Sequence, residues 1–339
     1  MAGGVRAGRD GSGRRGKSDG PDRGDDGLSP PPAEGDAADD EVAAHRKRTS
    51  TRRQLEQRHE QLDEVSPEIG VLDEEAFEKL LEESPDDALA MLADLTGATD
   101  PQLRALARRL AAQVFLQLAA RGPTRPRGVG RLATHRLRDE PGDLDVDASI
   151  DALVSARAAG AAPDPDELWV RQWRSPATAL SLVVDRSASM TGRPLATAAV
   201  AAAAVAWRAP VDYSVVSFGS DVVIARSQGS SLPPETVIDR VLALRGFGTT
   251  DVAAGLSAAE EQLARSPAKR KVTVLLSDCR STVDTDPLPV ARRLDELVIV
   301  GPEGDADEAI ELADAVGARC TVVSGPSDAA AALTRVLDR

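Results

Sequence analysis

The sequence predicts an α/β fold for its carboxyl-terminal half, with a doubly wound and mostly parallel sheet. Apolar runs such as Leu180-Ser-Leu-Val-Val and Val272-Thr-Val-Leu-Leu alternate with helical patterns from Leu168 onward. These runs show no polar alternation, which is typical of strands covered by helices on both faces. Phe218-Gly-Ser-Asp221 separates two short strand patterns and predicts a hairpin, and therefore one antiparallel edge strand.

We expect four regions along the chain. A disordered tail comes first, because it is rich in Gly, Arg, Asp, Ser and Pro and has few apolar residues. Three- and four-residue apolar spacings then predict a small helical module, in which Ser84-Pro85 begins a helix as cap and first turn. A linker with a short helix at 148–158 leads to the sheet domain. The predicted bounds are 1–55 for the tail, 56–122 for the helical module, 123–164 for the linker and 165–339 for the α/β domain.

Within the α/β domain the pattern gives each element in turn. Strands are predicted at Leu168–Trp173, Ala179–Asp185, Asp212–Phe218, Val222–Ala225, Lys271–Ser277, Glu296–Val300 and Arg319–Val323. Helices are predicted at Pro194–Trp207, Pro234–Leu244, Val252–Ala264, Pro289–Arg293, Asp305–Gly317 and Ser327–Asp338. This order of strands and helices is the basis for placing the candidate site.

Composition limits the function. The 339 residues have room for about two domains. Hydrophobic residues make up 42% but aromatic residues only 2%, so the core must consist of Ala, Val and Leu. The formal net charge of -14 disfavours nucleic acid and anionic membrane as partners.

The cysteines and the amino terminus point to a cytoplasmic protein. Cys279 and Cys320 are the only two cysteines, and they form neither a disulfide framework nor a zinc spacing, which suits a reducing compartment. No signal peptide is visible at the start of this sequence. The longest apolar run, Leu195 to Trp207, is too short to span a bilayer.

Oxygen-bearing side chains follow two of the apolar strands. Asp185 and Asp278 each end a strand, and the carboxyl ends of the strands form the ligand crevice of such a sheet. Ser187 and Ser189 stand at alternate positions after Asp185, and a glycine loop before the next helix carries Thr250. All five are hard oxygen donors, which favour Mg²⁺, or Mn²⁺ or Ca²⁺, over zinc. Helix capping is the alternative for Asp185, Ser187 or Thr250 taken singly.

These residues resemble a known signature. Asp185-Arg-Ser187-Ala-Ser189 looks like the DxSxS motif of von Willebrand factor type A (VWA) domains, Gly248-Thr-Thr250-Asp resembles their threonine loop, and Ser277-Asp278-Cys279 their fourth-strand aspartate. The resemblance covers about residues 165–339 and implies a metal-ion-dependent adhesion site (MIDAS). It implies direct metal binding by Ser187 and Ser189, binding by Thr250 directly or through water, and contact through water from Asp185 and Asp278. Ala188 and Cys279 stand where the family more often has glycine.

The same resemblance implies a binding module rather than an enzyme. A metal with one open position can bridge to a partner's Asp or Glu, whereas all three histidines precede the α/β domain and no nucleophile elbow is present. The chain resembles the bacterial CoxE-like group and the D subunits of magnesium chelatase-like complexes. That implies an adaptor working with a MoxR-type AAA+ ATPase in protein or metal-centre maturation. A chelatase-type metal-insertion subunit and a metal-dependent hydrolase are the alternatives.

One nucleotide motif is discounted. Gly11-Ser-Gly-Arg-Arg-Gly-Lys17-Ser18 satisfies the Walker A pattern, but a working P-loop lies between a strand and a helix. Here the match falls within the predicted disordered tail. We therefore expect any ATP hydrolysis to come from a partner subunit.

Overall fold

The computed structural model describes most of the chain from residue 49 onward. The described residues are 49–121, 131–138, 143–174, 178–186, 191–244, 246 and 248–337. Most of the predicted tail therefore lies outside the described residues. Its last four residues, 52–55, are helical, which contradicts the predicted disorder at that end.

Six strands form the main sheet in the order β6-β5-β4-β7-β8-β9. Their bounds are Thr178–Asp185 (β4), Tyr213–Phe218 (β5), Val222–Arg226 (β6), Arg270–Leu276 (β7), Glu296–Pro302 (β8) and Arg319–Val323 (β9). All neighbours are parallel except β5 and β6, which form the antiparallel edge hairpin. This confirms the predicted fold class. The chain leaves β4 toward β5 and returns on the other side to β7, so the strand order reverses between β4 and β7.

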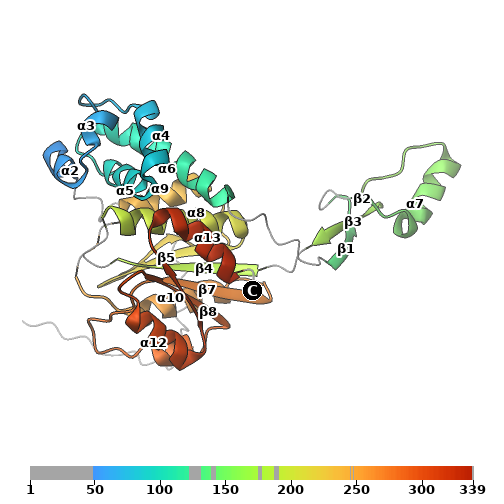
Figure 1. The fold of residues 1–339 in the computed structure, drawn as a ribbon. Helices are drawn as coiled ribbons and strands as arrows, with labels where there is room; N and C mark the ends of the chain where they lie inside the picture. Colours follow the sequence, from blue (N-terminus) through green and yellow to red (C-terminus); the bar gives the residue numbers. More distant parts are fainter. Residues whose placement is uncertain are drawn as a thin grey trace, which may run out of the picture. The chain divides into compact units, whose positions relative to one another are not determined.

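Helices cover both faces of this sheet (Figure 1). One layer consists of α8 (Arg193–Arg208), α9 (Pro234–Ala243) and α13 (Pro326–Leu337), and the other of α10 (Val252–Ala264), α11 (Leu288–Ala291) and α12 (Asp307–Val316). Successive residues of β4 serve the two layers alternately. Leu182 and Val184 belong to the core beneath α8, whereas Val183 belongs to the core beneath α10. Both faces of the sheet are therefore shielded from water, which explains the continuous apolar runs in the sequences of its strands.

The amino-terminal helices share the core of the sheet domain. They are α2 (Arg52–Arg58), α3 (Leu62–Val65), α4 (Glu74–Glu83), α5 (Pro85–Leu95) and α6 (Pro101–Arg121). Their buried side chains belong to the same cluster as those of α8, whose residues 195–206 are all buried. Alanine predominates in α8, so neighbouring helices can approach it on several sides. Ser84 occupies the N-cap position of α5, but, contrary to expectation, its side chain makes no capping hydrogen bond.

A second, three-stranded sheet corrects one prediction. The strand predicted at Leu168–Trp173 is β3 (Trp169–Arg174), which pairs antiparallel with β1 (Arg131–Arg136) and β2 (Asp143–Leu144), and not with the main sheet. Its sequence, Trp-Val-Arg-Gln-Trp-Arg, is richer in polar and charged residues than the central strands of the main sheet, which helices cover on both faces.

The expected linker helix is present beside β3, as α7 (Val146–Ala159). Asp145 caps its first turn and Gly160 ends it in the left-handed conformation. Among the described residues, no helix has the length and apolarity needed to cross a membrane.

Candidate metal centre

Asp185 and Ser277 meet at the point where the strand order reverses. The two strands that precede them, β4 and β7, are parallel neighbours with Val184 opposite Leu276. Asp185 is buried, and its Oδ2 accepts a hydrogen bond of 2.7 Å from the hydroxyl of Ser277. The bond fixes one carboxylate oxygen at the carboxyl edge of the sheet, where ligands bind in open α/β folds.

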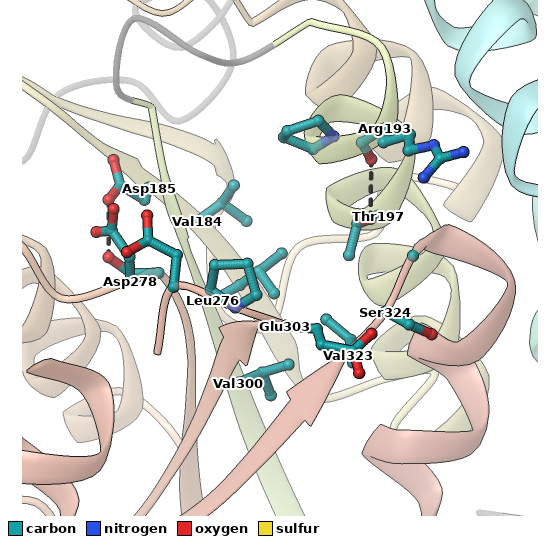
Figure 2. Close-up of a pocket in the computed structure, with 15 residues that line it drawn as sticks. Val184, Asp185, Arg193, Thr197, Leu276, Asp278, Val300, Glu303, Val323 and Ser324 are labelled. Atoms are coloured by element: carbon teal, nitrogen blue, oxygen red, sulfur yellow. Dashed lines mark hydrogen bonds between the residues drawn. The ribbon is translucent and has the colours of Figure 1, made fainter. Parts of the chain in front are cut away.

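Asp278 follows Ser277 in a tight turn. The Ser277 hydroxyl also accepts a 2.9 Å hydrogen bond from the Cys279 N–H, and Asp278 Oδ1 accepts one of 2.9 Å from the Arg280 N–H. Figure 2 shows the Asp185 and Asp278 carboxylates on the same side of the cavity that both residues line. Within the described residues Cys279 alone among non-glycines has a positive φ, at 64°. The left-handed conformation explains why glycine suits this position.

Thr250 is held by its backbone. Its N–H donates to Thr282 Oγ1 at 2.7 Å, and its carbonyl accepts from the N–H of Thr282 at 3.0 Å and from the hydroxyl of Ser281 at 3.2 Å. Thr250 is buried whereas Thr249 is exposed. Among the described residues no hydrogen bond engages the Thr250 hydroxyl, so that group can serve as a ligand.

The capping alternative does not account for these positions. The N-cap of α8 is Gly192, not Asp185 or Ser187, and the N-cap of α10 is Asp251, whose carboxylate accepts from the Ala254 N–H at 3.0 Å. Neither Asp185 nor Thr250 is therefore the N-cap of α8 or α10, although capping is the commonest role of such residues near the start of a helix.

The donor set fits a hard cation only if hydroxyl groups contribute. In the described part of the chain, no three His, Cys, Asp or Glu side chains lie together as a metal cluster. Asp185 and Asp278 alone are too few ligands for Mg²⁺, which prefers six oxygens. The remaining donors would be Thr250, water, and the hydroxyls of Ser187 and Ser189, which lie outside the described residues.

Arg186, the residue after Asp185, links the end of β4 to the β5–β6 hairpin. Its side chain is fully buried although it directly follows Asp185, and its guanidinium forms an ion pair with Asp221 in the β5–β6 hairpin. The Arg186 N–H also donates to the Phe218 carbonyl at 2.7 Å. These contacts fix the first residue of the serine loop to the neighbouring hairpin.

Cys279 is an unreactive neighbour of the site. Burial raises the pKa of its thiol to about 12, and the nearby Asp278 and Asp185 carboxylates act in the same direction. A protonated thiol is a poor metal ligand and a poor nucleophile.

The helical module contacts Gly192, the N-cap residue of α8. Asp94 of α5 accepts a 2.9 Å hydrogen bond from the N–H of Gly192, and His59 Nε2 lies 3.0 Å from the same carboxylate. Asp94 is buried, which alone would raise its pKa. The hydrogen bonds from His59 and Gly192 outweigh burial and hold the pKa of Asp94 below its usual value.

Sequence reasoning missed three contributors to this geometry. Ser277, Thr282 and Asp94 position the candidate ligands or the ends of their loops, but each acts on a segment far away in the chain. Only the Ser277-Asp278-Cys279 string gave a signal, because Ser277 stands next to a candidate ligand. Nothing in the sequence of α5 points to Gly192.

A cavity of about 330 Å³ lies beside the two aspartates. Four buried or half-buried strand residues line its inner part, and charged residues line its edge (Figure 2). The apolar set is Val184, Leu276, Val300 and Val323, and the charged set is Asp185, Arg193, Asp278, Glu303 and Asp305. Pockets of this size hold a small ligand or a side chain of a partner.

A family model described as "VWA domain containing CoxE-like protein" matches residues 106–335. Among solved structures, the chain is similar to von Willebrand factor type A from Catenulispora acidiphila, with 16% identity, a TM-score of 0.39, and coverage of 49% of this chain and 43% of that one. It is also similar to proximal thread matrix protein 1 from the mussel byssus with a zinc-occupied MIDAS motif (18% identity, TM-score 0.39, coverage 48% and 47%).

A third similar structure is manganese-loaded TRAP protein from Plasmodium vivax, with 19% identity, a TM-score of 0.37, and coverage of 47% of this chain and 72% of that one. The match spans less than half the length of the first two structures. No curated protein matches the chain at a significant level.

Proposed function

Because the chain belongs to the family of VWA domain-containing CoxE-like proteins, we propose that its sheet domain binds a partner protein through one divalent cation. The observation that carries this proposal is the meeting of Asp185 with the Ser277-Asp278 turn at the strand-order reversal, fixed by the 2.7 Å hydrogen bond between Asp185 and Ser277.

We propose different modes of metal binding for the five candidate ligands. Ser187 and Ser189 bind the cation directly, Thr250 binds it directly or through water, and Asp185 and Asp278 act through water. The burial of Thr250 and the backbone bonds that orient it support its choice over the exposed Thr249. Mg²⁺ suits a site of short oxygen-bearing side chains that retains several waters, and Mn²⁺ or Ca²⁺ would use the same donors.

The last coordination position is the proposed link to the partner. A carboxylate from a partner protein would occupy it, so the cation bridges the two chains. We assign binding rather than catalysis, because no histidine is among the described residues that line the cavity beside the aspartates.

The partner we propose is an AAA+ ATPase of MoxR type, on the basis of the CoxE-like resemblance. The pair would act on a third protein in its maturation or in the maturation of its metal centre, with ATP hydrolysis supplied by the partner. The only Walker A match of the chain, residues 11–18, lies outside the described residues. This assignment rests on the family and not on a contact in the structure.

Metal binding is tested by calorimetric titration of Mg²⁺ and Mn²⁺ into the full chain. Asp185→Ala should lose at least about tenfold in affinity, as removal of metal-site residues commonly does. Asp295→Ala is the matched control, since Asp295 is exposed and lies just before β8, at the opposite edge of the sheet. Equal affinities for wild type and Asp185→Ala would overturn the metal site.

The partner is tested by co-expression with a MoxR-type AAA+ ATPase of the same organism. The complex should persist in Mg²⁺, dissociate in chelator, and fail to form with Asp185→Ala. A complex that resists chelation, or none at all, would contradict the bridging mechanism.

A further inference from the structure

The cavity beside the candidate metal centre combines an apolar floor with an acidic edge. Val184, Leu276, Val300 and Val323 come from four adjacent strands, β4, β7, β8 and β9, and supply the apolar lining of its floor. Such a floor suits a chain of methylene groups.

Arg193 and Asp305 at the edge already have charged partners. Arg193 pairs with Asp87 of α5 at 2.7 Å, and Asp305 accepts a 3.2 Å hydrogen bond from Arg280. Glu303 is exposed, and no ion pair engages it among the described residues. Figure 2 shows Glu303 on the other side of the cavity from Asp185 and Asp278.

The Glu303 carboxylate would attract a cationic group of the ligand. A divalent ion at the proposed site would balance Asp185 and Asp278, and a partner carboxylate would add one negative charge. Glu303 would then be a second negative charge at the same cavity. A like charge from the partner would be repelled there, whereas a cation would complement Glu303.

We propose that this cavity receives a Lys or Arg side chain of the partner, close to the acidic residue that bridges to the metal. The methylene stem would lie on the valine and leucine floor while its charged end meets Glu303, as long cationic side chains do at apolar surfaces. The partner segment is thereby specified further, as an acidic residue with a basic neighbour. The link to a bridging carboxylate rests on the proposed function, but the cation pocket itself does not.

Two contacts from helix α5 reach the wall of the cavity. Asp87 holds Arg193 at the start of α8, and Asp86 accepts a 2.9 Å hydrogen bond from the Ser327 N–H at the start of α13. Both contacts come from the first turn of α5. A preformed pocket loses less conformational freedom when it is filled, which favours binding.

The test uses n-butylguanidinium as the probe, with butyrate as its anionic counterpart, in ligand-observed NMR on the full chain. Butylguanidinium should bind more tightly than butyrate. Glu303→Gln should weaken it by about two- to fivefold, the range expected for one partly exposed charge pair. Glu311→Gln is the matched control, because Glu311 is an exposed carboxylate on α12 that does not line the cavity. Ser324→Trp should block the pocket without changing charge.

The outcomes separate this inference from the metal proposal. Equal binding of the two probes, or unchanged binding in both Glu303→Gln and Ser324→Trp, would overturn the pocket. The measurement is repeated in chelator and in Asp185→Ala. Butylguanidinium binding that survives both would support the pocket even where metal binding fails. Metal affinity with no preference for the cation would leave the metal site standing and remove the pocket.

Discussion

Asp94 in helix α5 and Gly192 at the start of helix α8 are joined by a hydrogen bond of 2.9 Å, although 98 residues separate them. Gly192 follows Ser187 and Ser189 closely in the sequence. The family model begins at residue 106, so Asp94 belongs to a part of the chain that the family match does not include. The helical module therefore contributes directly to the backbone that leaves the candidate metal loop.

Replacing Asp94 should destabilise the protein and weaken its metal affinity. Asp94→Ala leaves the Gly192 N–H without its acceptor and removes the buried partner of His59, which should lower the free energy of unfolding by about 3 kcal/mol. Asp87→Ala is the control, since half of that side chain is exposed and its ion pair should contribute less than about 1 kcal/mol. Urea unfolding and Mn²⁺ titration would measure the two effects. An Asp94→Ala protein as stable as Asp87→Ala would refute the anchoring role.

The contribution of Asp94 should also depend on pH. Its folded-state pKa lies below the ordinary value of 3.8, so its stabilisation is present above that value and is lost as the pH falls through the folded-state pKa. The difference in unfolding free energy between wild type and Asp94→Ala should therefore shrink as the pH falls below about 4. A difference that grows on acidification would contradict the assignment.

The sheet domain could be predicted because its local patterns agree with its tertiary structure. Helix α10 and strand β9 have the predicted bounds, Val252–Ala264 and Arg319–Val323. Strands buried on both faces consist mainly of apolar residues, so the sequence pattern identifies them. Because the strands that precede them are parallel, Asp185 and Asp278 are expected at the same edge of the sheet. By contrast, β3 joins the smaller sheet, because which strands pair is decided by contacts between segments and not by the pattern of one strand.

The tertiary contacts of the helical module could not be predicted from its sequence either. Its helices were predicted from apolar spacing, but the surface that receives their apolar faces is α8, whose own sequence is mostly alanine. Likewise the candidate ligands Asp185 and Thr250 have a sequence signature, whereas Ser277 and Thr282 position them through hydrogen bonds that depend on the folded geometry. Ser187 and Ser189, being outside the described residues, stay predictions.

The two adjacent threonines offer a sharp test of the ligand set. Thr250→Val should weaken Mn²⁺ binding about tenfold or more, because it removes a buried hydroxyl from the proposed site. Thr249→Val removes an exposed hydroxyl one residue away and should leave the affinity unchanged. Titration of both variants would decide the assignment, and the reverse order of effects would place Thr249 at the metal.

Ser277 should act on the metal through Asp185. Ser277→Ala deletes the donor that fixes Asp185 Oδ2, so metal affinity should fall by about tenfold, as for other residues that orient a ligand. Ser266→Ala is the control, since the Ser266 hydroxyl also donates to an aspartate, Asp212, but one that lies just before β5 at the opposite edge of the sheet. Calorimetric titration would compare them, and an unaffected Ser277→Ala would mean that the turn alone positions Asp185.

The cysteines should differ in reactivity from ordinary thiols. With the pKa of Cys279 raised to about 12, roughly one molecule in ten thousand carries the thiolate at about pH 8, so alkylation there should be very slow. Burial also raises the pKa of Cys320, but its side chain is more exposed. Iodoacetamide labelling of the chelator-treated protein followed by peptide mass analysis should modify Cys320 first and Cys279 only after unfolding. Early labelling of Cys279 would show that its turn opens in the native state.

Gly255 in α10 should not tolerate alanine, despite the usual preference of helices for that residue. A Cβ atom at Gly255 would lie 2.7 Å from the ring of Phe218, which is fully buried in β5. Overpacking costs about 1–3 kcal/mol, which exceeds the gain in helix propensity of about 1 kcal/mol. Thermal unfolding should therefore show Gly255→Ala less stable than wild type. Ser257→Ala, in the same helix, should be neutral or slightly stabilising. A stabilised Gly255→Ala would mean that α10 can move away from the sheet at little cost.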